Sequence, residues 1–598
     1  MTSLTAPVAS DQDGTYPRPQ LMRSHWFELD GPWDFGYGSG PDEQPTRAVF
    51  DRSITVPYPP ESPASGIGDT SYHPVVWYRR AVSKADLTRA GHSEEKSRVI
   101  LHFGAVDWVA HVWLNEQFLG THEGGQSAFS FDITDSLSPE GENTLIVRAF
   151  DDPHDVSIPR GKQDWLESPH SIWYHRTTGI WQPVWLEAVP PLHIDELSWQ
   201  SDLPAASVSL ELSFSIQPKD DTWATIRLQF GDEPLAEARF RVSQQTAQLQ
   251  LTLDRQRNGQ HYEELLWDPE HPRLIDATII LTHGDERVDT VSSYFGLRSV
   301  ATSRRRFLLN DRPLYLRSVL SQNYWPESHL AAPSPEALRR EVELIKELGF
   351  NTARIHQKAE DPRFLFWADR LGLLIWGETA SAYDFNPRAV VSLTTEWMSL
   401  IRRDRSHPSI VVWVPFNESW GLQHIAHSPQ QQAFSRSLTD LTRAIDPTRP
   451  VISNDGWEHT SSDIWTIHDY DTDPTTIINR YASDSSVQAV LEGFGPNGRR
   501  VSVTQLDHEQ PIMLTEFGGV SYIEEPIAGA WGYSTAHNAP EFETKVVELI
   551  CAAQQSPILS GFCYTQLTDT GQETNGLLRA DRTPKIPIDK LRATIQNR

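Results

Sequence analysis

Strand patterns alternate with helix patterns throughout the second half of this chain, and this alternation limits the fold more than any other feature. The helix pattern Ser334–Gly349 is typical, because it begins at a capping serine followed by proline and ends at a glycine. Further helices are predicted at Pro362–Gly372, within Ala389–Arg405, around Gln430–Ile445 and at Phe542–Gln555. The predicted strands are Leu314–Leu320, Thr352–His356, Leu373–Glu378, Ile410–Phe416, Val451–Ser453, Ile464–Ile467, Ile512–Thr515 and Gly561–Thr565. This alternation predicts a C-terminal (β/α)8 TIM barrel.

The first half of the chain carries an all-β pattern. Before Pro190 the short runs, such as Val76–Arg80 and Val99–Phe103, are separated by Gly, Pro, Asn and Asp, as in a jelly roll. After Pro191 the alternating runs Val208–Ile216 and Ala224–Phe230 fit an immunoglobulin-like β-sandwich. We therefore divide the 598 residues, which are too many for one core, into domains at 1–190, 191–297 and 298–598.

Composition excludes several classes of function. The formal net charge of −28 argues against nucleic acid or an anionic membrane as a partner. No apolar run reaches membrane-spanning length, and the N-terminal residues show neither a basic nor an apolar segment of a secretion signal, so we expect a cytoplasmic protein. Cys551 and Cys563 fall in a helix and a strand pattern, which predicts buried thiols instead of a disulfide.

Two of the predicted strands lead into a glutamate. Ile410–Gly421 runs from a continuous apolar stretch, typical of a strand buried on both faces, into Asn417 and Glu418. A single strand-end glutamate is more often a helix cap than a catalytic group. Pro511–Gly519 repeats the pattern, however, with Glu516 after an apolar strand. Two carboxylates at barrel strand ends, roughly 5–5.5 Å apart, are what retaining glycoside hydrolysis requires.

These motifs and the order of the domains resemble glycoside hydrolase family 2, which contains β-galactosidases, β-glucuronidases and β-mannosidases. The similar segments are Arg402–Gly421 before the acid/base glutamate, Pro511–Gly519 at the nucleophile, Leu308–Val319 at the start of the barrel, Phe350–His356 at its second strand, and Thr178–Leu186 at the close of the first domain. The resemblance covers nearly the whole chain. It implies a sugar-binding jelly roll and a catalytic barrel.

The resemblance also implies roles for the motif residues. Glu418 would be the acid/base and Glu516 the nucleophile, with Asn417 bonding the sugar 2-hydroxyl. Tyr470 is placed to bond the nucleophile, although a core tyrosine would give the same pattern. An acid that keeps its proton near neutral pH needs burial or a nearby negative charge, whereas the nucleophile needs hydrogen-bond donors.

Three further residues would shape the sugar site in a protein of this family. His356 would line the sugar subsite, or else be a structural imidazole bonded to the backbone. Trp420 and Glu378 would shape the pocket. Magnesium-dependent β-galactosidases bind the ion with an acid at the position of Glu378, but a buried salt bridge fits equally well. We predict that no metal or cofactor is required. Binding of Mg²⁺ at Glu378 is the alternative to a buried salt bridge there.

The positions that would identify the sugar depart from the family. Family β-glucuronidases have Asn-x-Lys after strand eight, but no lysine stands beside Asn575 here, which argues against a glucuronide. Gln322 or Asn323 replaces the histidine that β-galactosidases have after strand one. Tyr564 or Gln566 replaces the strand-eight tryptophan, and an aspartate common in the first domain is missing from 170–173.

The sequence thus predicts an exo-acting retaining glycosidase, nominally of the β-galactosidase type. A β-D-galactofuranosidase or α-L-arabinofuranosidase is the alternative within the family, because a five-membered ring would explain the altered positions. A non-catalytic carbohydrate-binding protein is the alternative from another class, which both retained carboxylates argue against. Transglycosylation would use the same two residues. We expect a glycoside or small oligosaccharide as partner, and self-association, common in the family, stays open.

Overall fold

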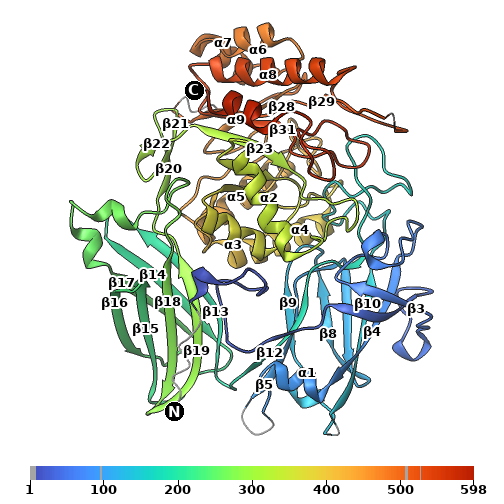
Figure 1. The fold of residues 1–598 in the computed structure, drawn as a ribbon, viewed down its shortest axis with the longest axis vertical. Helices are drawn as coiled ribbons and strands as arrows, with labels where there is room; N and C mark the ends of the chain where they lie inside the picture. The colour runs from blue at the N-terminus through green and yellow to red at the C-terminus, as the bar shows by residue number, and fades with distance from the viewer. Residues whose placement is uncertain (1–7, 94–96, 140, 505–508, 526, 598) are drawn as a thin grey trace.

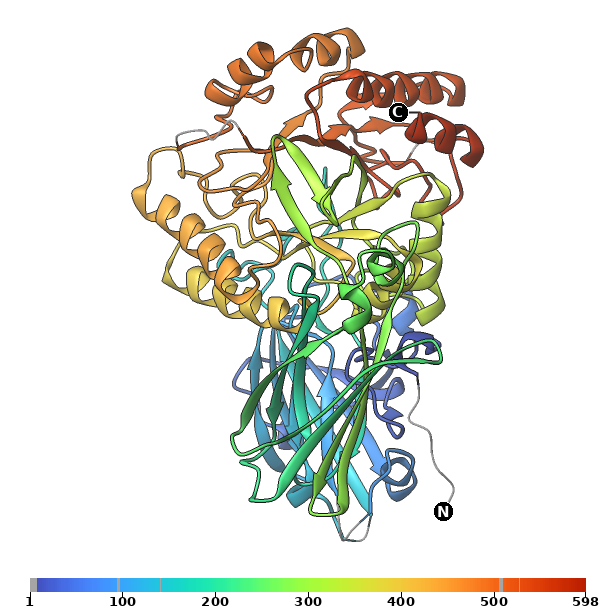
Figure 2. The same ribbon diagram turned by 90° about the vertical axis from the view of Figure 1, so that its left-hand side faces the viewer.

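The computed structural model describes residues 8–597 apart from 94–96, 140, 505–508 and 526. Two β-domains lie side by side, and the C-terminal barrel sits on top of both (Figure 1). The view turned by 90° shows the same arrangement, with one β-domain in front of the other below the barrel (Figure 2). The predicted architecture of jelly roll, immunoglobulin-like sandwich and barrel is confirmed.

The first domain is a sandwich of two antiparallel sheets. One sheet has the order β3 (Arg52–Val56), β2 (Gly31–Tyr37), β4 (Val75–Ser83), β10 (Glu142–Phe150), β7 (Val109–Leu114) and β8 (Gln117–Glu123). The other has the order β1 (Phe27–Glu28), β12 (Val184–Val189), β5 (Arg98–Phe103) and β9 (Phe129–Asp132). Alternate residues of β5 are buried, as the sequence pattern predicts for a strand with one face on the core. The short helix α1 (Lys84–Arg89) and the pair β6 (Val106–Asp107) and β11 (Gly179–Ile180) complete the domain.

The second domain is a smaller sandwich with its own core. One sheet has the order β13 (Ile194–Asp202), β14 (Ser207–Phe214) and β17 (Thr246–Thr252). The other has the order β16 (Glu233–Arg241), β15 (Thr222–Phe230), β18 (Ile275–His283) and β19 (Glu286–Phe295). The predicted strands Val208–Ile216 and Ala224–Phe230 correspond to β14 and β15. A small sheet of β20 (Val300–Ser303), β21 (Arg306–Leu309) and β22 (Arg312–Pro313) leads into the barrel.

Seven parallel strands form the barrel sheet in the described part of the chain. Their order is β26 (Ile410–Val414), β25 (Leu374–Glu378), β24 (Thr352–Ile355), β23 (Leu316–Ser321), β31 (Gly561–Thr565), β28 (Ile512–Gly518) and β27 (Trp465–Asp469). The prediction of a strand at Val451–Ser453 was wrong, because this segment forms a single bridge, from Val451 to Trp413 of β26. A second single bridge follows, between Asp455 and Asn417. The chain turns at Gly456, whose φ of 82° interrupts an extended ladder.

The predicted barrel helices are confirmed as α2 (Pro335–Glu347), α3 (Pro362–Leu371), α4 (Pro387–Asp404), α5 (Pro429–Ile445) and α8 (Ala539–Gln555). Each begins with a side-chain cap that accepts a backbone N–H, followed by proline in the first turn. The helices α6 (Pro474–Arg480), α7 (Asp484–Glu492) and α9 (Ile588–Gln596) were not predicted. None of the described helices is both long and apolar enough to cross a membrane. Cys551 and Cys563 are free thiols, as predicted, but only Cys563 is fully buried and Cys551 is partly exposed.

The first domain also reaches the carboxyl ends of the barrel strands, through its long segment between β10 and β11. The backbone N–H of Gly161 donates to the carbonyl of Ser381 (3.1 Å). The side chain of Gln572, which follows β31, donates to the carbonyls of Ser171 (2.8 Å) and Trp173 (2.7 Å). The face of the barrel at the carboxyl ends of its strands is therefore built from two domains.

Candidate active site

Glu418 lies in a turn of unusual backbone conformation after β26. Glu418 (φ 50°) and Ser419 (φ 58°) both have the left-handed backbone conformation, which residues other than glycine seldom adopt. The N–H of Glu418 donates to the carbonyl of Asp455 (3.0 Å), and the N–H of Ser419 donates to Oδ1 of Asn454 (2.9 Å). These bonds hold a conformation that costs about 1–3 kcal/mol in isolation, and such strain concentrates at functional sites.

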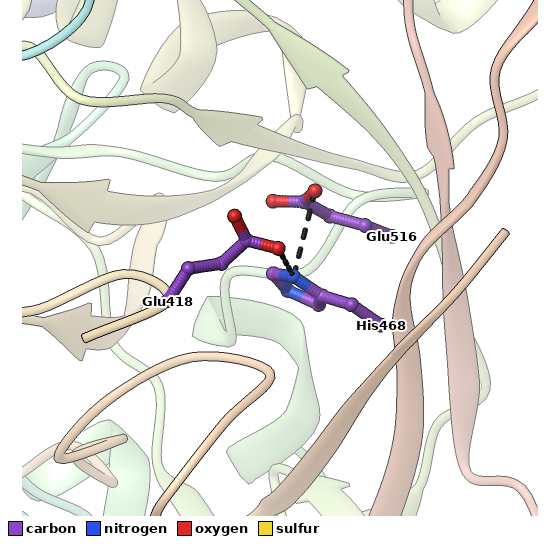
Figure 3. Close-up of side chains that lie close together, drawn as sticks. All are labelled: Glu418, His468 and Glu516. Atoms are coloured by element: carbon purple, nitrogen blue, oxygen red, sulfur yellow. Dashed lines mark hydrogen bonds and ion pairs between the residues drawn. The ribbon is translucent and has the colours of Figure 1, made fainter. Parts of the chain in front are cut away.

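Glu516 lies within β28 and is 5% exposed. The pairing of β28 with each neighbour shifts register beside this residue, as bulges near active sites often do. The hydroxyl of Tyr470 donates to Oε2 (2.6 Å), and Nη1 of Arg354 donates to Oε1 (2.9 Å). One oxygen of Glu516 and one of Glu418 lie within 4.8 Å of each other, so the two glutamates are as close as a retaining pair requires (Figure 3).

His468, in β27, lies between the two glutamates (Figure 3). Its Nδ1 is 2.7 Å from Oε1 of Glu418 and 3.5 Å from Oε2 of Glu516. Its Nε2 is 3.0 Å from Oδ2 of Asp455. Burial opposes the charged imidazolium, but the carboxylates of Glu516, Asp455 and Glu418 outweigh burial and raise the pKa of His468 to about 10. His468 is therefore a cation at neutral pH.

Gly456 makes room for this imidazole. A Cβ at position 456 would collide with the ring of His468, and the positive φ of Gly456 also favours glycine. The close approach of backbone and ring fixes the histidine between its three carboxylate partners.

Arg354 is fully buried behind the glutamates and connects the site. Its guanidinium forms an ion pair with Asp455 (2.7 Å) and donates to Oδ1 of Asn417 (2.6 Å), to Glu516 and to Glu378. Burial by itself would raise the pKa of Glu516, but the charges of His468 and Arg354 lower it to about 2. The nucleophile candidate is therefore ionised.

Tyr470 supplies the remaining bond to Glu516. Burial and the neighbouring Glu516 carboxylate raise its pKa well above the ordinary value, so the hydroxyl stays a donor. Tyr533 stacks on Tyr470 with ring centroids 3.3 Å apart and planes 5° apart. This stack fixes the tyrosine beside the nucleophile.

The structure brings His356 and Glu378 into the same network. Nδ1 of His356 is 3.1 Å from Oε2 of Glu378, which also accepts the N–H of Gln357 (3.0 Å). Arg354 takes the other oxygen of Glu378. Both carboxylate oxygens are thus occupied by internal donors, so Glu378 fits the buried salt bridge better than a magnesium ligand. Glu418, His468 and Glu516 could each offer an atom to a metal, but Arg354, Tyr470 and the cationic imidazole oppose an added cation.

The remaining predicted residues lie around this centre in different ways. Trp420 stacks on Trp173 of the first domain, with centroids 6.1 Å apart. Nε2 of Gln322 donates to Oε1 of Gln566 (2.9 Å). Asn323 points elsewhere and donates to Oε2 of Glu360 (2.5 Å).

Tyr564 has a different environment from the other predicted residues. It is fully buried and packs edge-on against Phe517, with centroids 5.5 Å apart. This packing is typical of a core tyrosine, so Gln566 and not Tyr564 connects to the polar network on this face.

Sequence reasoning missed Arg354, Asp455 and His468. A usable signal existed for two of them, because alternate residues of a strand share a face. Arg354 stands two residues before His356, and His468 stands two residues before Tyr470. Asp455 lies in an irregular segment whose position the pattern could not give.

Comparison with known families agrees with the fold and the geometry. Three sequence models of one family match in order: glycosyl hydrolases family 2, sugar binding domain (residues 42–190), glycosyl hydrolases family 2 (192–298), and glycosyl hydrolases family 2, TIM barrel domain (300–524). Together these matches span most of the chain.

Individual relatives are more distant. A putative β-glucuronidase of Formosa agariphila is 26% identical over 62% of this chain and 44% of that protein. A β-galactosidase of Thermoanaerobacter pseudethanolicus is 26% identical over 64% and 49%, so the chain spans about half the length of these curated relatives. The crystal structure of a GH2 β-galacturonidase of Eisenbergiella tayi bound to glycerol superposes with a TM-score of 0.72 at 18% identity and covers 97% of both chains, which shows the shared fold.

Proposed function

We propose a retaining glycosidase activity for this chain, which belongs to the glycosyl hydrolases family 2. The observation that carries the proposal is the pair of carboxylates at the carboxyl ends of two barrel strands, with one oxygen of each within 4.8 Å of an oxygen of the other. That separation suits a nucleophile facing an acid/base, because an inverting pair leaves room for a water between the carboxyl groups.

The reaction proceeds by two displacements at the anomeric carbon. In the first, Glu516 attacks this carbon while Glu418 gives its proton to the glycosidic oxygen, and the leaving group departs as an alcohol. In the second, Glu418 takes a proton from water, whose oxygen attacks the same carbon and releases Glu516. No cofactor is needed, because both steps balance with the two glutamates and water.

The electrostatics support this assignment of roles. Glu516 accepts bonds from Arg354 and Tyr470, which keep it ionised for attack. Glu418 is hydrogen-bonded to His468 (2.7 Å), which fixes the orientation of the carboxyl group toward Glu516. Asn417 is oriented by Arg354 (2.6 Å), so its side-chain amide N–H₂ can bond the sugar 2-hydroxyl.

The sugar is nominally a terminal β-D-galactopyranoside, with galactofuranosides and arabinofuranosides as the second candidates. Relatives bear the names of β-galactosidase and β-glucuronidase, which supports a pyranose. Gln322 and Gln566 stand at positions where the family has other residues that contact the sugar, which supports a substrate different from those of β-galactosidases and β-glucuronidases. A cytoplasmic location and self-association stay predictions, which cell fractionation and light scattering test.

A panel of p-nitrophenyl glycosides tests the proposal. It includes the β-D-galactopyranoside, β-D-glucuronide, β-D-mannopyranoside, β-D-galactofuranoside and α-L-arabinofuranoside, each with wild type, Glu418→Gln and Glu516→Gln. We expect turnover of one neutral glycoside that both variants abolish. Turnover that survives Glu516→Gln would refute the assignment. Sugar binding without turnover, unchanged in both variants, would support a carbohydrate-binding protein.

A further inference from the structure

A lysine of the first domain forms a buried ion pair with a glutamate of the barrel. Nζ of Lys162 lies 2.9 Å from Oε2 of Glu573, and the two residues are 4% and 2% exposed. Glu573 follows β31, and Lys162 belongs to the first-domain segment that covers the catalytic face. Burying such a pair costs desolvation free energy and seldom stabilises the fold, so stability alone does not explain why the pair is buried here.

The segment that carries Glu573 is connected to the proposed nucleophile through a stack of aromatic rings. Residues 572–574 pair with Trp531 through the N–H of Trp531 to the carbonyl of Gln572 (2.8 Å) and the N–H of Thr574 to the carbonyl of Trp531 (3.0 Å). The ring of Trp531 contacts Tyr533 (4.7 Å), which stacks on Tyr470, the donor to Glu516. The Tyr533 pKa, raised mainly by burial, is raised further by the charges of Glu418, Glu516 and Glu573.

A chain of buried side chains continues from the pair across the barrel face. Nδ2 of Asn575 donates to Oε1 of Glu573 (3.3 Å), and Nε2 of Gln566 donates to Oδ1 of Asn575 (2.7 Å). Nε2 of Gln322 donates to Oε1 of Gln566 (2.9 Å). Gln322 is 1% exposed, and its Oε1 accepts no hydrogen bond from the described residues. A buried unpaired acceptor is costly, so a donor from outside the chain, a water molecule or a ligand hydroxyl, is required to satisfy it.

Arg354 and Lys162, two buried cations on this face, are already matched by carboxylates. Arg354 is paired with Glu516 and two other acids, and Lys162 with Glu573. A substrate carboxylate would meet the charge of Glu573 where it needs an unpaired cation. Neutral hydroxyl groups face no such penalty.

We propose that the chain from Gln322 through Gln566, Asn575 and Glu573 to Lys162 is the subsite that reads the hydroxyls of an uncharged terminal sugar. Glu573 excludes uronic acids by neutralising Lys162, and Gln322 Oε1 accepts a bond from a sugar hydroxyl. This inference rests on the proposed glycosidase activity and assigns its preference for neutral sugars over uronic acids to particular residues.

Charge-changing variants test the subsite. Glu573→Gln keeps the shape and frees the charge of Lys162, and the double variant Lys162→Met/Glu573→Gln removes both charges. For each protein, kcat/KM is measured with a neutral p-nitrophenyl glycoside and its uronide, and the affinities for D-galactose and D-galacturonate are measured by calorimetry. Asp569→Asn breaks the buried pair of Asp569 with Lys585 (2.7 Å) and serves as the matched control.

In wild type we expect the neutral ligand to be preferred. In Glu573→Gln the ratio of uronide to neutral activity, and of galacturonate to galactose affinity, rises about 10- to 100-fold, the range of one charged hydrogen bond. The double variant does not show this rise. Asp569→Asn changes kcat/KM and affinity by the same factor for the neutral ligand and for the uronide. A wild-type preference for uronides, or an unchanged ratio in Glu573→Gln, overturns the inference. Absence of turnover with every neutral glycoside and uronide overturns the proposed function instead, and galacturonate bound as tightly as galactose by wild type still refutes the subsite.

Discussion

Replacing His468 with asparagine is the most informative single perturbation of this site. Asparagine can still donate toward Glu418, but it removes the cation that lies 3.5 Å from Glu516. The charge of His468 is the largest of the charge effects that lower the pKa of Glu516 to about 2 from an ordinary 4.5. An opposite charge at this range shifts a carboxyl by about 1–3 units, and Arg354 remains 2.9 Å away, so we expect a rise of about 1–2 units.

The dependence of kcat/KM on pH measures this shift. Its acid limb reports the free enzyme's nucleophile, which must be ionised, and therefore moves to higher pH by about 1–2 units in the variant. An acid limb that stays in place while kcat falls would refute the claim that His468 acts on Glu516 through its charge. His468→Gln, which can donate toward Asp455 instead of Glu418, should show the same shift and so separates charge from hydrogen bonding.

The same substitution changes stability with a defined sign. The folded pKa of His468, about 10, lies above its ordinary 6.5, so its contribution is complete below about pH 6.5 and is lost as pH rises through 10. Removing one partner from a buried ion-pair network costs about 3–5 kcal/mol, so His468→Asn should unfold in less urea at pH 7. Asp455→Asn in the same chain restores the charge balance and should recover part of the loss. A loss of equal size at pH 7 and above pH 10 would contradict this reasoning.

Three other perturbations test the bond to the nucleophile, the contact between the domains and the need for a metal. Tyr470→Phe deletes a 2.6 Å hydrogen bond to an ionised carboxylate, worth about 1.5–3 kcal/mol, so kcat should fall about 10- to 100-fold while the fold, followed by circular dichroism, is kept. Trp173→Ala removes the first-domain ring that stacks on Trp420; we expect a higher KM for glycosides with aromatic leaving groups and little change for methyl glycosides. Because Arg354 and His356 occupy the oxygens of Glu378, treatment with EDTA should leave the rate with p-nitrophenyl glycosides unchanged, and a loss restored by Mg²⁺ would contradict this.

Periodicity was sufficient for most of the barrel. The continuous apolar strand Ile410–Val414 and the capped helix after Ser334 form where their patterns predict, because local propensity and burial agree there. The segment after Pro450 was predicted as a strand but forms only single bridges, since two apolar residues before a turn cannot sustain a ladder. The short helices α6 and α7 were missed because their apolar pattern spans too few turns.

The charged network could not be read from the pattern. Glu418 and Glu516 stand in recognisable motifs, but Arg354 and His468 are charged residues inside strands, which would ordinarily be assigned to an exposed face. Their burial depends on partners from other strands, and Asp455 supplies one from an irregular segment. Lys162 comes from another domain more than four hundred residues before Glu573, so the pair becomes visible only in the folded chain.

The stereochemistry of the reaction tests the central claim most directly. Proton NMR of the first sugar released shows whether the anomeric configuration is retained, and a fluorinated glycoside that slows hydrolysis of the covalent intermediate labels the nucleophile for peptide mass spectrometry. The account predicts retention and a label on the peptide that contains Glu516. Inversion, or a label on any other residue, would contradict the double displacement proposed for this site.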